Sequence, residues 1–198
     1  MEGRFRLVAG LGNPGREYER TRHNVGFLVA EALAHRAGAG FAHEPKWNAD
    51  VARAGEVTFM KPMTFMNLSG ESVGDFCHFF KLEPSQALIV IDDVALPLGR
   101  LRMRGNGSDG GHNGLESVLM HLGTAQVPRL RVGIGIGKFA DGGAKDSLTG
   151  HVLGKFSAAE QPALDEAVGR AADAIEFAQA NGLEAAMNKF NPKENKAS

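Results

Sequence analysis

Short apolar runs alternate along the chain with stretches in which apolar residues recur at helical spacing. The apolar runs predict buried strands at residues 5–12, 57–61 and 87–91. The helical spacing predicts helices at residues 25–36 and 71–81, and a third that follows a glycine-rich loop and continues to Leu122. Strand and helix therefore follow one another through most of the sequence.

The rest of the chain adds two strands and a helical end. Residues 98–104 alternate polar and apolar positions, as an edge strand does, with basic side chains on one face. Residues 130–137 also alternate, and their glycines would let another group approach the backbone closely. From Ser157 the spacing is helical as far as Gly182, with Ser157 and Glu160 predicted as a capping box, and a short helix follows.

Strands that alternate with helices indicate an α/β layer fold. We expect a single domain with a mixed, mostly parallel central sheet and helices on both of its faces. The chain has 198 residues, shows no internal repeat and has no linker long enough to separate two domains. The domain is predicted to span residues 1–192 and to be followed by a polar tail at 193–198.

The composition predicts a soluble protein with a sizeable core, because 43% of the residues are hydrophobic and 23% are charged. No apolar run approaches the roughly 20 residues that a membrane span needs. The sequence enters its first predicted strand almost at once, which leaves no room for a signal peptide. The single cysteine, Cys77, cannot form an internal disulfide, so we expect a reducing, cytoplasmic location.

The charge is distributed unevenly. The formal net charge of the chain is −1, whereas residues 98–156 carry eight basic and four acidic side chains. The net charge argues against a protein that binds nucleic acid indiscriminately, but a local basic patch suits a partner held through a few phosphates. Ordinary variation of surface charge explains the same counts equally well.

Polar residues with catalytic potential follow predicted strands or precede predicted helices. They are Asn13, His23, Asn67, Asp92 and Asn113. In open α/β sheets the loops beyond the carboxyl ends of the strands line the site, so we expect these side chains to meet there. A histidine oriented by a carboxylate can take a proton from water near neutral pH, and uncharged amides can hold a carbonyl group and a developing oxyanion. The pattern predicts general-base chemistry.

Each member of this group also has a purely structural explanation. Asn13 before proline and glycine is a common turn residue, and Asn113 with Glu116 predicts an N-cap pair at the third helix. Asp93 stands next to Asp92 and is its immediate rival. An isolated histidine is more often a surface or capping residue than a catalyst. Only the combination favours a catalytic site.

Other chemistries fit the sequence less well. Residues 10–15 match the dinucleotide pattern G-x-G-x-x-G, but Pro14 and the polar loop after it disfavour a helix that opens inside the motif. The sequence lacks a G-x-S-x-G elbow and a P-loop, and its histidines lack the spacing of metal ligands, so we expect neither metal nor cofactor. Cys77 and His78 would point to different faces of a helix, which indicates core packing for Cys77.

Several longer segments together resemble one known family. They are GLGNPGREYERTRHNVGF, KPMTFMNLSG, DDVALPLG, GGHNGL, RLRVGIG and HVLGKF, and they lie in this order between about residue 6 and residue 156. In this combination the sequence resembles the bacterial peptidyl-tRNA hydrolases. The resemblance implies a monomeric α/β enzyme that hydrolyses the ester between an N-blocked aminoacyl group or peptide and tRNA, with no metal, cofactor or obligate protein partner.

The resemblance also implies roles for individual residues. It implies His23 as the general base, Asp92 as the carboxylate that keeps this histidine basic, and Asn13 as the residue that distinguishes blocked from free aminoacyl groups. It implies substrate-binding positions at Tyr18, Phe65, Met66, Asn67, His112 and Asn113, and cations facing the tRNA at Arg104 and Arg131. An RNA-binding relative that has lost hydrolysis remains an alternative.

Two segments depart from the family's usual sequence. Ile91 and Ala95 stand where the family often has polar residues around Asp92, which predicts a more apolar environment for the catalytic pair. Ser108 and Asp109 stand where glycine and a basic or polar residue are common, so the charge of the glycine-rich loop differs. Because Asp92 itself is retained, we still expect activity.

Overall fold

The computed structural model describes residues 4–135 and 150–191. Its strands form one seven-stranded sheet in the order β2-β3-β4-β1-β5-β7-β6. They are β1 (Leu7–Gly10), β2 (Ala42–Glu44), β3 (Ala49–Ala54), β4 (Val57–Pro62), β5 (Ala87–Asp93), β6 (Leu101–Arg104) and β7 (Arg129–Gly133). Strands β4, β1, β5 and β7 are parallel, whereas β3 and β6 pair antiparallel with β4 and β7, and β2 pairs antiparallel with β3. The predicted mixed, mostly parallel sheet is confirmed.

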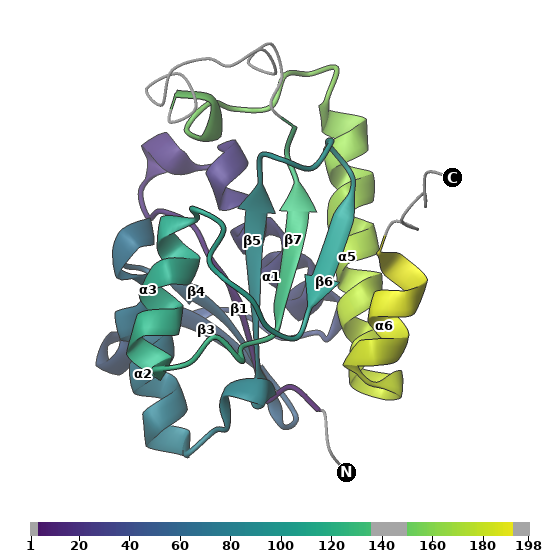
Figure 1. Cartoon of the computed structure of the whole chain (residues 1–198). Coiled ribbons are helices and arrows are strands. Elements are labelled where there is room, and N and C mark those ends of the chain that lie inside the picture. The colour runs from purple at the N-terminus through teal and green to yellow at the C-terminus, as the bar shows by residue number, and fades with distance from the viewer. Residues whose placement is uncertain (1–3, 136–149, 192–198) are drawn as a thin grey trace.

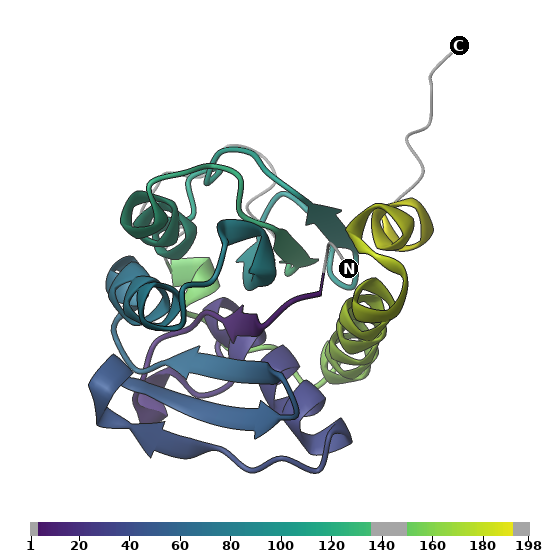
Figure 2. The same cartoon turned by 90° about the horizontal axis from the view of Figure 1, so that it is seen from below.

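Helices cover both faces of the sheet, as predicted (Figure 1); Figure 2 shows the two layers from below. They are α1 (Val25–Arg36), α2 (Ser69–Phe80), α3 (Asn113–Leu122), α5 (Gln161–Asn181) and α6 (Leu183–Phe190). Helices α1, α5 and α6 share a buried cluster with Val8 and Leu88, and α2 and α3 share another with Leu7 and Ile89. Alternate residues of β1 and β5 thus pack against the helices on opposite faces of the sheet, as the two-residue period of a strand requires. Within the described ranges, no helix has the length and apolar character needed to cross a bilayer.

The loops that leave three parallel strands collect at one edge of the sheet. Strands β1, β4 and β5 run in the same direction, so their carboxyl ends lie together. A 3₁₀ turn, η2 (Arg22–Asn24), follows the loop after β1 and leads directly into α1. A second 3₁₀ turn, η4 (Met66–Leu68), follows β4 and leads directly into α2. This edge is the place where the sequence predicts the site.

Some strand predictions differ from the structure or lie outside it. The hairpin of β2 and β3 was not predicted, because its strands are short and interrupted by polar and small residues. The strand predicted at 130–137 is observed as β7, which starts one residue earlier and ends at Gly133. Residues 136–137 and the predicted polar tail at 193–198 lie outside the described residues.

Two predicted N-caps differ from the structure. Helix α5 begins at Gln161 with Glu160 as its N-cap. Of the capping box predicted for Ser157 and Glu160, the bond from the backbone N–H of Ser157 to the Glu160 carboxylate is present (2.8 Å), but the Ser157 side chain does not cap the helix. The cap of α3 is His112 rather than Asn113, because the His112 side chain accepts a backbone N–H from the first turn. The imidazole supplies the acceptor that the sequence pattern predicts for the asparagine.

Helix α1 approaches the sheet closely through two glycines. Gly10 ends β1, and Gly26 lies in the first turn of α1. A Cβ atom on Gly26 would lie 2.6 Å from the backbone N and O of Leu11 and from the carbonyl oxygen of Val90. A Cβ atom on Gly10 would overlap the carbonyl group of Gly26. Because η2 immediately precedes α1, this contact determines how near His23 comes to the end of β5.

Substitution of Gly26 tests this packing. We expect Gly26→Ala to lower the free energy of unfolding by about 3 kcal/mol, because the new methyl group meets backbone atoms that cannot move aside. Gly40→Ala is the matched control, since a Cβ atom at Gly40 meets nothing within 4 Å. Its effect should stay within about 0.5 kcal/mol. Urea unfolding measures both, and equal values for the two variants would contradict the close approach.

Candidate active site

A cavity of about 470 Å³ lies at the carboxyl edge of the sheet. Its lining residues are Asn13, His23, Phe65, Met66, Asn67, Asp92, Asp93, Val94, Gly110, Gly111, His112, Asn113, Arg131, Val152 and Leu153. Apart from Tyr18 and Arg104, every site residue proposed from the sequence is in this lining. The apolar wall of Val94, Val152 and Leu153 was missed, although the last two belong to the HVLGKF segment.

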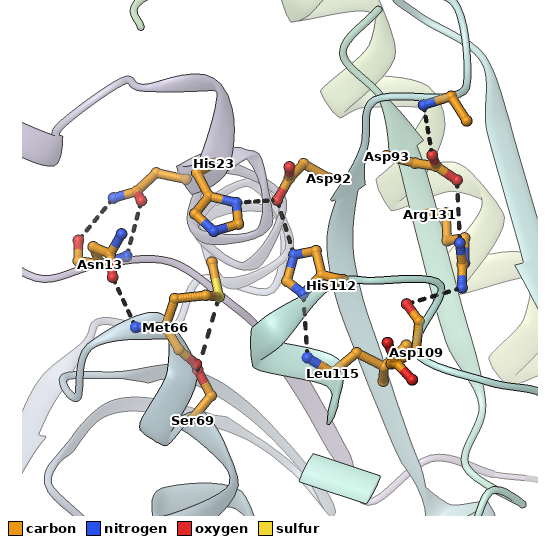
Figure 3. Close-up of polar contacts among 12 residues, drawn as sticks. Asn13, His23, Met66, Ser69, Asp92, Asp93, Asp109, His112, Leu115 and Arg131 are labelled. Atoms are coloured by element: carbon orange, nitrogen blue, oxygen red, sulfur yellow. Dashed lines mark hydrogen bonds and ion pairs between the residues drawn. The ribbon is translucent and has the colours of Figure 1, made fainter. Parts of the chain in front are cut away.

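His23 and Asp92 are in direct contact. The Nδ1 atom of His23 lies 2.6 Å from Oδ1 of Asp92 (Figure 3). Both side chains are largely buried, with exposed fractions of 14% and 3%. No group in the described part of the chain is hydrogen-bonded to Nε2 of His23, and this residue lines the cavity. The histidine therefore has one nitrogen on the carboxylate and the other available to a substrate or water.

A second histidine contacts the same carboxylate oxygen. Nε2 of His112 lies 3.0 Å from Oδ1 of Asp92, and the ring centroids of His23 and His112 are 5.1 Å apart. Burial alone would raise the pKa of Asp92, but the interactions with His112 and His23 outweigh it and hold this pKa well below its usual range. Asp92 is therefore ionised near neutral pH. A carboxylate only accepts hydrogen bonds, so both imidazoles donate to it.

Asn13 is held firmly beside this pair. Its backbone N–H donates to Oδ1 of Asn24 and its carbonyl oxygen accepts from Nδ2 of Asn24, each at 2.9 Å. Its side-chain Oδ1 accepts the backbone N–H of Met66 at 2.7 Å. Because Oδ1 is occupied in this way, the two N–H groups of the amide are what Asn13 can offer to the cavity. The anchoring role of Asn24 was not predicted, since its burial is invisible in the sequence.

Asp93 has a different set of partners from Asp92. One of its carboxylate oxygens lies 3.4 Å from Nη1 of Arg131. Arg131 also donates to two backbone carbonyl oxygens of the loop that precedes α3. Successive residues of a strand point to opposite sides, which separates the two carboxylates. The contacts thus place Asp92, and not its neighbour, against His23.

The residues that depart from the family's usual sequence lie on β5, in the loop after it, and in the glycine-rich loop. Ile91 is buried with α2 and α3, and Ala95 is exposed. Asp109 accepts the backbone N–H of Gly111 with its carboxylate (2.7 Å), and the carbonyl oxygen of Ser108 accepts from both arginines of β7 (3.1 and 3.2 Å). The glycine-rich loop is therefore bonded to itself and to the sheet.

The rim of the cavity carries exposed amide and aromatic side chains. Asn67 and Asn113 are exposed, and Phe65 has an exposed fraction of 56%. Tyr18 packs edge-on against Phe65, with ring centroids 6.5 Å apart, but is not in the lining. These positions suit contact with a substrate that extends out of the cavity.

Arginines of β6 and β7 form a basic face beside the cavity. Arg102 pairs in register with Arg131, and Arg104 pairs with Arg129. Arg129 is fully buried and donates to backbone carbonyl oxygens, whereas Arg104 is exposed. Of the two cations proposed for the tRNA, Arg131 is brought to the cavity and Arg104 lies outside its lining.

The site contains one cluster of metal-ligand types. His23, Asp92 and His112 are the described residues whose potential ligand atoms lie within 4.8 Å of one another. The separations of 2.6 and 3.0 Å are those of hydrogen bonds, and nitrogens that donate protons to Asp92 have no lone pair for a metal. The cluster is therefore a hydrogen-bond network. A search for ligand spacing could not detect it, because the three residues come from three separate elements.

Two alternative chemistries lose support from the geometry. No helix begins inside the motif at residues 10–15; a 3₁₀ turn at Arg16–Tyr18 follows it, and α1 starts only at Val25. The helix N-terminus that a pyrophosphate needs is missing at this motif. Cys77 is buried, burial raises the pKa of its thiol to about 12, and His78 is exposed. These two residues form no nucleophilic pair.

Arg22 ties the turn η2 to the C-terminal part of the chain. Its guanidinium forms a two-point ion pair with Glu160, at 3.0 and 2.8 Å, and lies 4.7 Å from the ring centroid of Phe156. Its backbone N–H donates to the carbonyl oxygen of Gly154 at 2.9 Å. These contacts hold the cavity wall at residues 152–153 against the turn that carries the candidate base.

A central sheet with a histidine–carboxylate pair at the carboxyl ends of its strands is an arrangement of α/β enzymes that use acid–base chemistry. A family model described as Peptidyl-tRNA hydrolase matches residues 7–198. The chain belongs to this family.

Individual relatives agree over nearly the whole length. The chain is 47% identical to the peptidyl-tRNA hydrolase of Synechococcus sp. (strain JA-3-3Ab), over 95% of this chain and 83% of that protein. It is 44% identical to the peptidyl-tRNA hydrolase of Akkermansia muciniphila, over 96% of this chain and 98% of that protein. The crystal structure of peptidyl-tRNA hydrolase from Acinetobacter baumannii matches it with a TM-score of 0.86, 37% identity and 94% coverage of both chains.

The ion pair between Arg22 and Glu160 should make stability depend on pH. The hydrogen bonds from Arg22 lower the pKa of Glu160 from 4.5 to about 2. A carboxyl whose pKa is depressed by folding stabilises the protein above its unfolded pKa and loses this effect as the pH falls through the folded value. Glu160→Gln should therefore cost about 1 kcal/mol at pH 7, because the pair is partly exposed to solvent. The cost should shrink between pH 4.5 and 2.

Urea unfolding of wild type and variant at several pH values measures this difference. Glu166→Gln, an exposed position on the same helix, is the control and should change stability by less than about 0.5 kcal/mol at each pH. A difference between wild type and Glu160→Gln that stays constant from pH 7 to the acid range would refute the assigned role of the ion pair.

Proposed function

We propose that this chain hydrolyses the ester bond between the peptide and the tRNA of peptidyl-tRNA, with His23 as the general base. Membership of the peptidyl-tRNA hydrolase family supports the substrate and the bond that is cut. The observation that carries the role of His23 is the 2.6 Å contact of its Nδ1 with Asp92, which leaves Nε2 toward the cavity. All residues that the proposal uses come from a single chain, so a monomer suffices.

The proposed reaction is direct attack by water. Nε2 of His23 takes a proton from water as the oxygen bonds to the ester carbonyl carbon. Asp92 accepts from Nδ1–H and stabilises the imidazolium that forms. The tetrahedral intermediate then breaks its bond to the ribose oxygen of the terminal nucleotide. That oxygen receives the proton from His23, which returns to its neutral form, and the products are a peptide acid and tRNA.

The amides are proposed to hold the substrate. The oxygen of Asn13 is bonded to Met66, so its N–H groups are available to a carbonyl oxygen of the peptide. Asn67 and Asn113 are exposed at the rim and can bind further along the peptide or the terminal ribose. Phe65 supplies an exposed aromatic face next to them. Uncharged donors of this kind polarise a carbonyl group and stabilise the oxyanion that develops on it.

The basic face of β6 and β7 is proposed to bind the tRNA backbone. Arg131 lines the cavity and Arg104 is exposed on the neighbouring strand. The ion pair of Arg131 with Asp93 is long, at 3.4 Å, and leaves the guanidinium able to bind a phosphate. Contacts of this type add affinity that decreases as the salt concentration rises. They do not distinguish one base sequence from another.

Replacement of His23 tests the general base. His23→Ala should reduce the release of tRNA from N-acetyl-aminoacyl-tRNA by about 10²–10⁴-fold, because positioned general-base catalysis has that magnitude. Its affinity for tRNA should be nearly unchanged, since the basic face remains intact. A turnover equal to that of wild type would remove His23 from the reaction. An inactive wild type that still binds tRNA would instead favour the silent RNA-binding relative.

Replacement of the arginines tests the tRNA face. Arg104→Ala and Arg131→Ala should each weaken substrate capture and reduce the slope of log affinity against log salt by about one unit per lost phosphate contact. The control is Arg36→Ala, because Arg36 is paired with Asp173 and Glu176 on the surface of α1 and α5. If a substitution at either proposed position leaves the salt slope as it is in the control, that residue does not contact a phosphate.

A further inference from the structure

The contacts of His112 determine its protonation state. Its Nδ1 accepts the backbone N–H of Leu115 at 3.2 Å, and a backbone N–H can only donate. Its Nε2 lies 3.0 Å from the carboxylate of Asp92, which can only accept. Nδ1 is therefore unprotonated, and Nε2 carries the proton. His112 is a neutral imidazole in one tautomer, fixed by the start of α3 on one side and by Asp92 on the other (Figure 3).

This bonding leaves His112 with no free polar atom for the substrate. Both ring nitrogens are occupied within the protein, and the exposed fraction of its side chain is 8%. The part of His112 that lines the cavity can therefore offer only carbon atoms. The substrate-binding role implied by the family resemblance does not follow from these contacts.

The hydrogen bond from His112 also acts on His23. Oδ1 of Asp92 receives two N–H groups, at 2.6 Å from His23 and 3.0 Å from His112. Because the two N–H groups share one oxygen, the second donor reduces the negative charge that Oδ1 offers to His23. It also places the positive end of its N–H dipole near the imidazolium that His23 would form. Both effects weaken the preference of Asp92 for a protonated His23.

We propose that His112 is a positioning residue: as a neutral donor anchored to the N-terminus of α3, it holds the Asp92 carboxylate against His23 and moderates the proton affinity of His23. The inference rests on the proposed role of His23 as the base. Its consequence is that His23 stays unprotonated, and able to accept a proton, at a lower pH than a histidine paired with an unshared carboxylate.

Charged groups near this cluster are either bonded within the protein or exposed to solvent. The bonded ones include Arg22, Asp93, Asp109, Arg131, His151 and Glu160. Glu116, in the first turn of α3, is exposed. Arg22 is bonded to Glu160, and Asp93 to Arg131. Asp109 bonds a backbone N–H of its own loop, and the ring of His151 lies 2.6 Å from the carbonyl oxygen of Gly135. The carboxylate that bonds directly to His23 is the one shared with His112.

His112→Asn separates the two contacts of the imidazole. Asparagine is a preferred N-cap, so its side-chain oxygen can accept the Leu115 N–H, but it is too short to reach Asp92. We expect kcat for N-acetyl-aminoacyl-tRNA to fall by about 10- to 100-fold, as when a supporting hydrogen bond is lost, while KM stays within about twofold. The acid limb of kcat/KM should move to higher pH by about 0.5–1 unit, because the unshared carboxylate holds the proton on His23 more strongly.

Two further variants, His112→Ala and His23→Asn, distinguish the positioning role of His112 from an effect on folding and from the proposed function. His112→Ala loses the cap as well, so its Tm should fall by about 2–4 °C, whereas the Tm of His112→Asn should stay within about 2 °C of wild type. A raised KM with unchanged kcat in His112→Asn, or an unmoved acid limb, overturns the inference. His23→Asn is measured alongside: wild-type turnover in that variant would remove His23 as the proposed base, independently of His112, and no turnover by the wild type would mean that the proposed hydrolysis has failed.

A measurement on the unaltered protein gives a second test. Nitrogen-15 spectra of the imidazoles should show His112 with a bare Nδ1 and a protonated Nε2 throughout the pH range in which His23 titrates. His23 should begin in the opposite tautomer, with the proton on Nδ1. A His112 ring that takes up a second proton at or above the pH at which His23 does so overturns the inference, even if no variant folds.

Discussion

The site depends on one oxygen atom, Oδ1 of Asp92, which accepts hydrogen bonds from two imidazoles. A carboxylate buried in this way loses its hydration, a loss of several kcal/mol unless charge-compensating or hydrogen-bonding partners replace the water. His23 and His112 are those partners, and they come from opposite layers of the fold. The ionised state of Asp92 therefore requires that the η2–α1 segment and the start of α3 both be in place. The geometry of the candidate site and the packing of the fold are linked through a single carboxylate.

Small residues allow the two layers to meet over the end of β5. Gly26 brings α1 against the backbone of β1 and β5 on one side. On the other side Gly114 lies in the first turn of α3, where a Cβ atom would overlap the sulfur of Met66. Met66 in turn donates its backbone N–H to Asn13. Close packing at these points determines the positions of His23, His112 and Asn13 together, because protein interiors deform little.

Much of this arrangement could be predicted from the sequence, and the rest could not for identifiable reasons. The apolar runs, the position of Asp92 at a strand end and that of His23 before a helix were sufficient to predict a mostly parallel sheet with a site at its carboxyl edge. Periodicity could not show which side chain caps a helix, because an imidazole at His112 and an amide at Asn113 are both possible acceptors. It also missed the shared use of Asp92, which depends on three elements meeting in space and not on any spacing along the chain.

The proposed function requires one domain to bind a polyanion and also to carry out a proton transfer, and the distribution of charge is compatible with both. Nearby phosphates would favour the protonated form of His23 and so reduce the fraction of His23 that can accept a proton. The exposed Arg104 lies on β6, outside the cavity lining, and Arg131 in the lining is partly balanced by Asp93. A tRNA backbone held on that face would place its charge next to arginine and in screened solvent, where its field on His23 is small. Because His112 is neutral, Asp92 is the charged group that is hydrogen-bonded to His23. Binding of the polyanion therefore need not change the protonation state of His23.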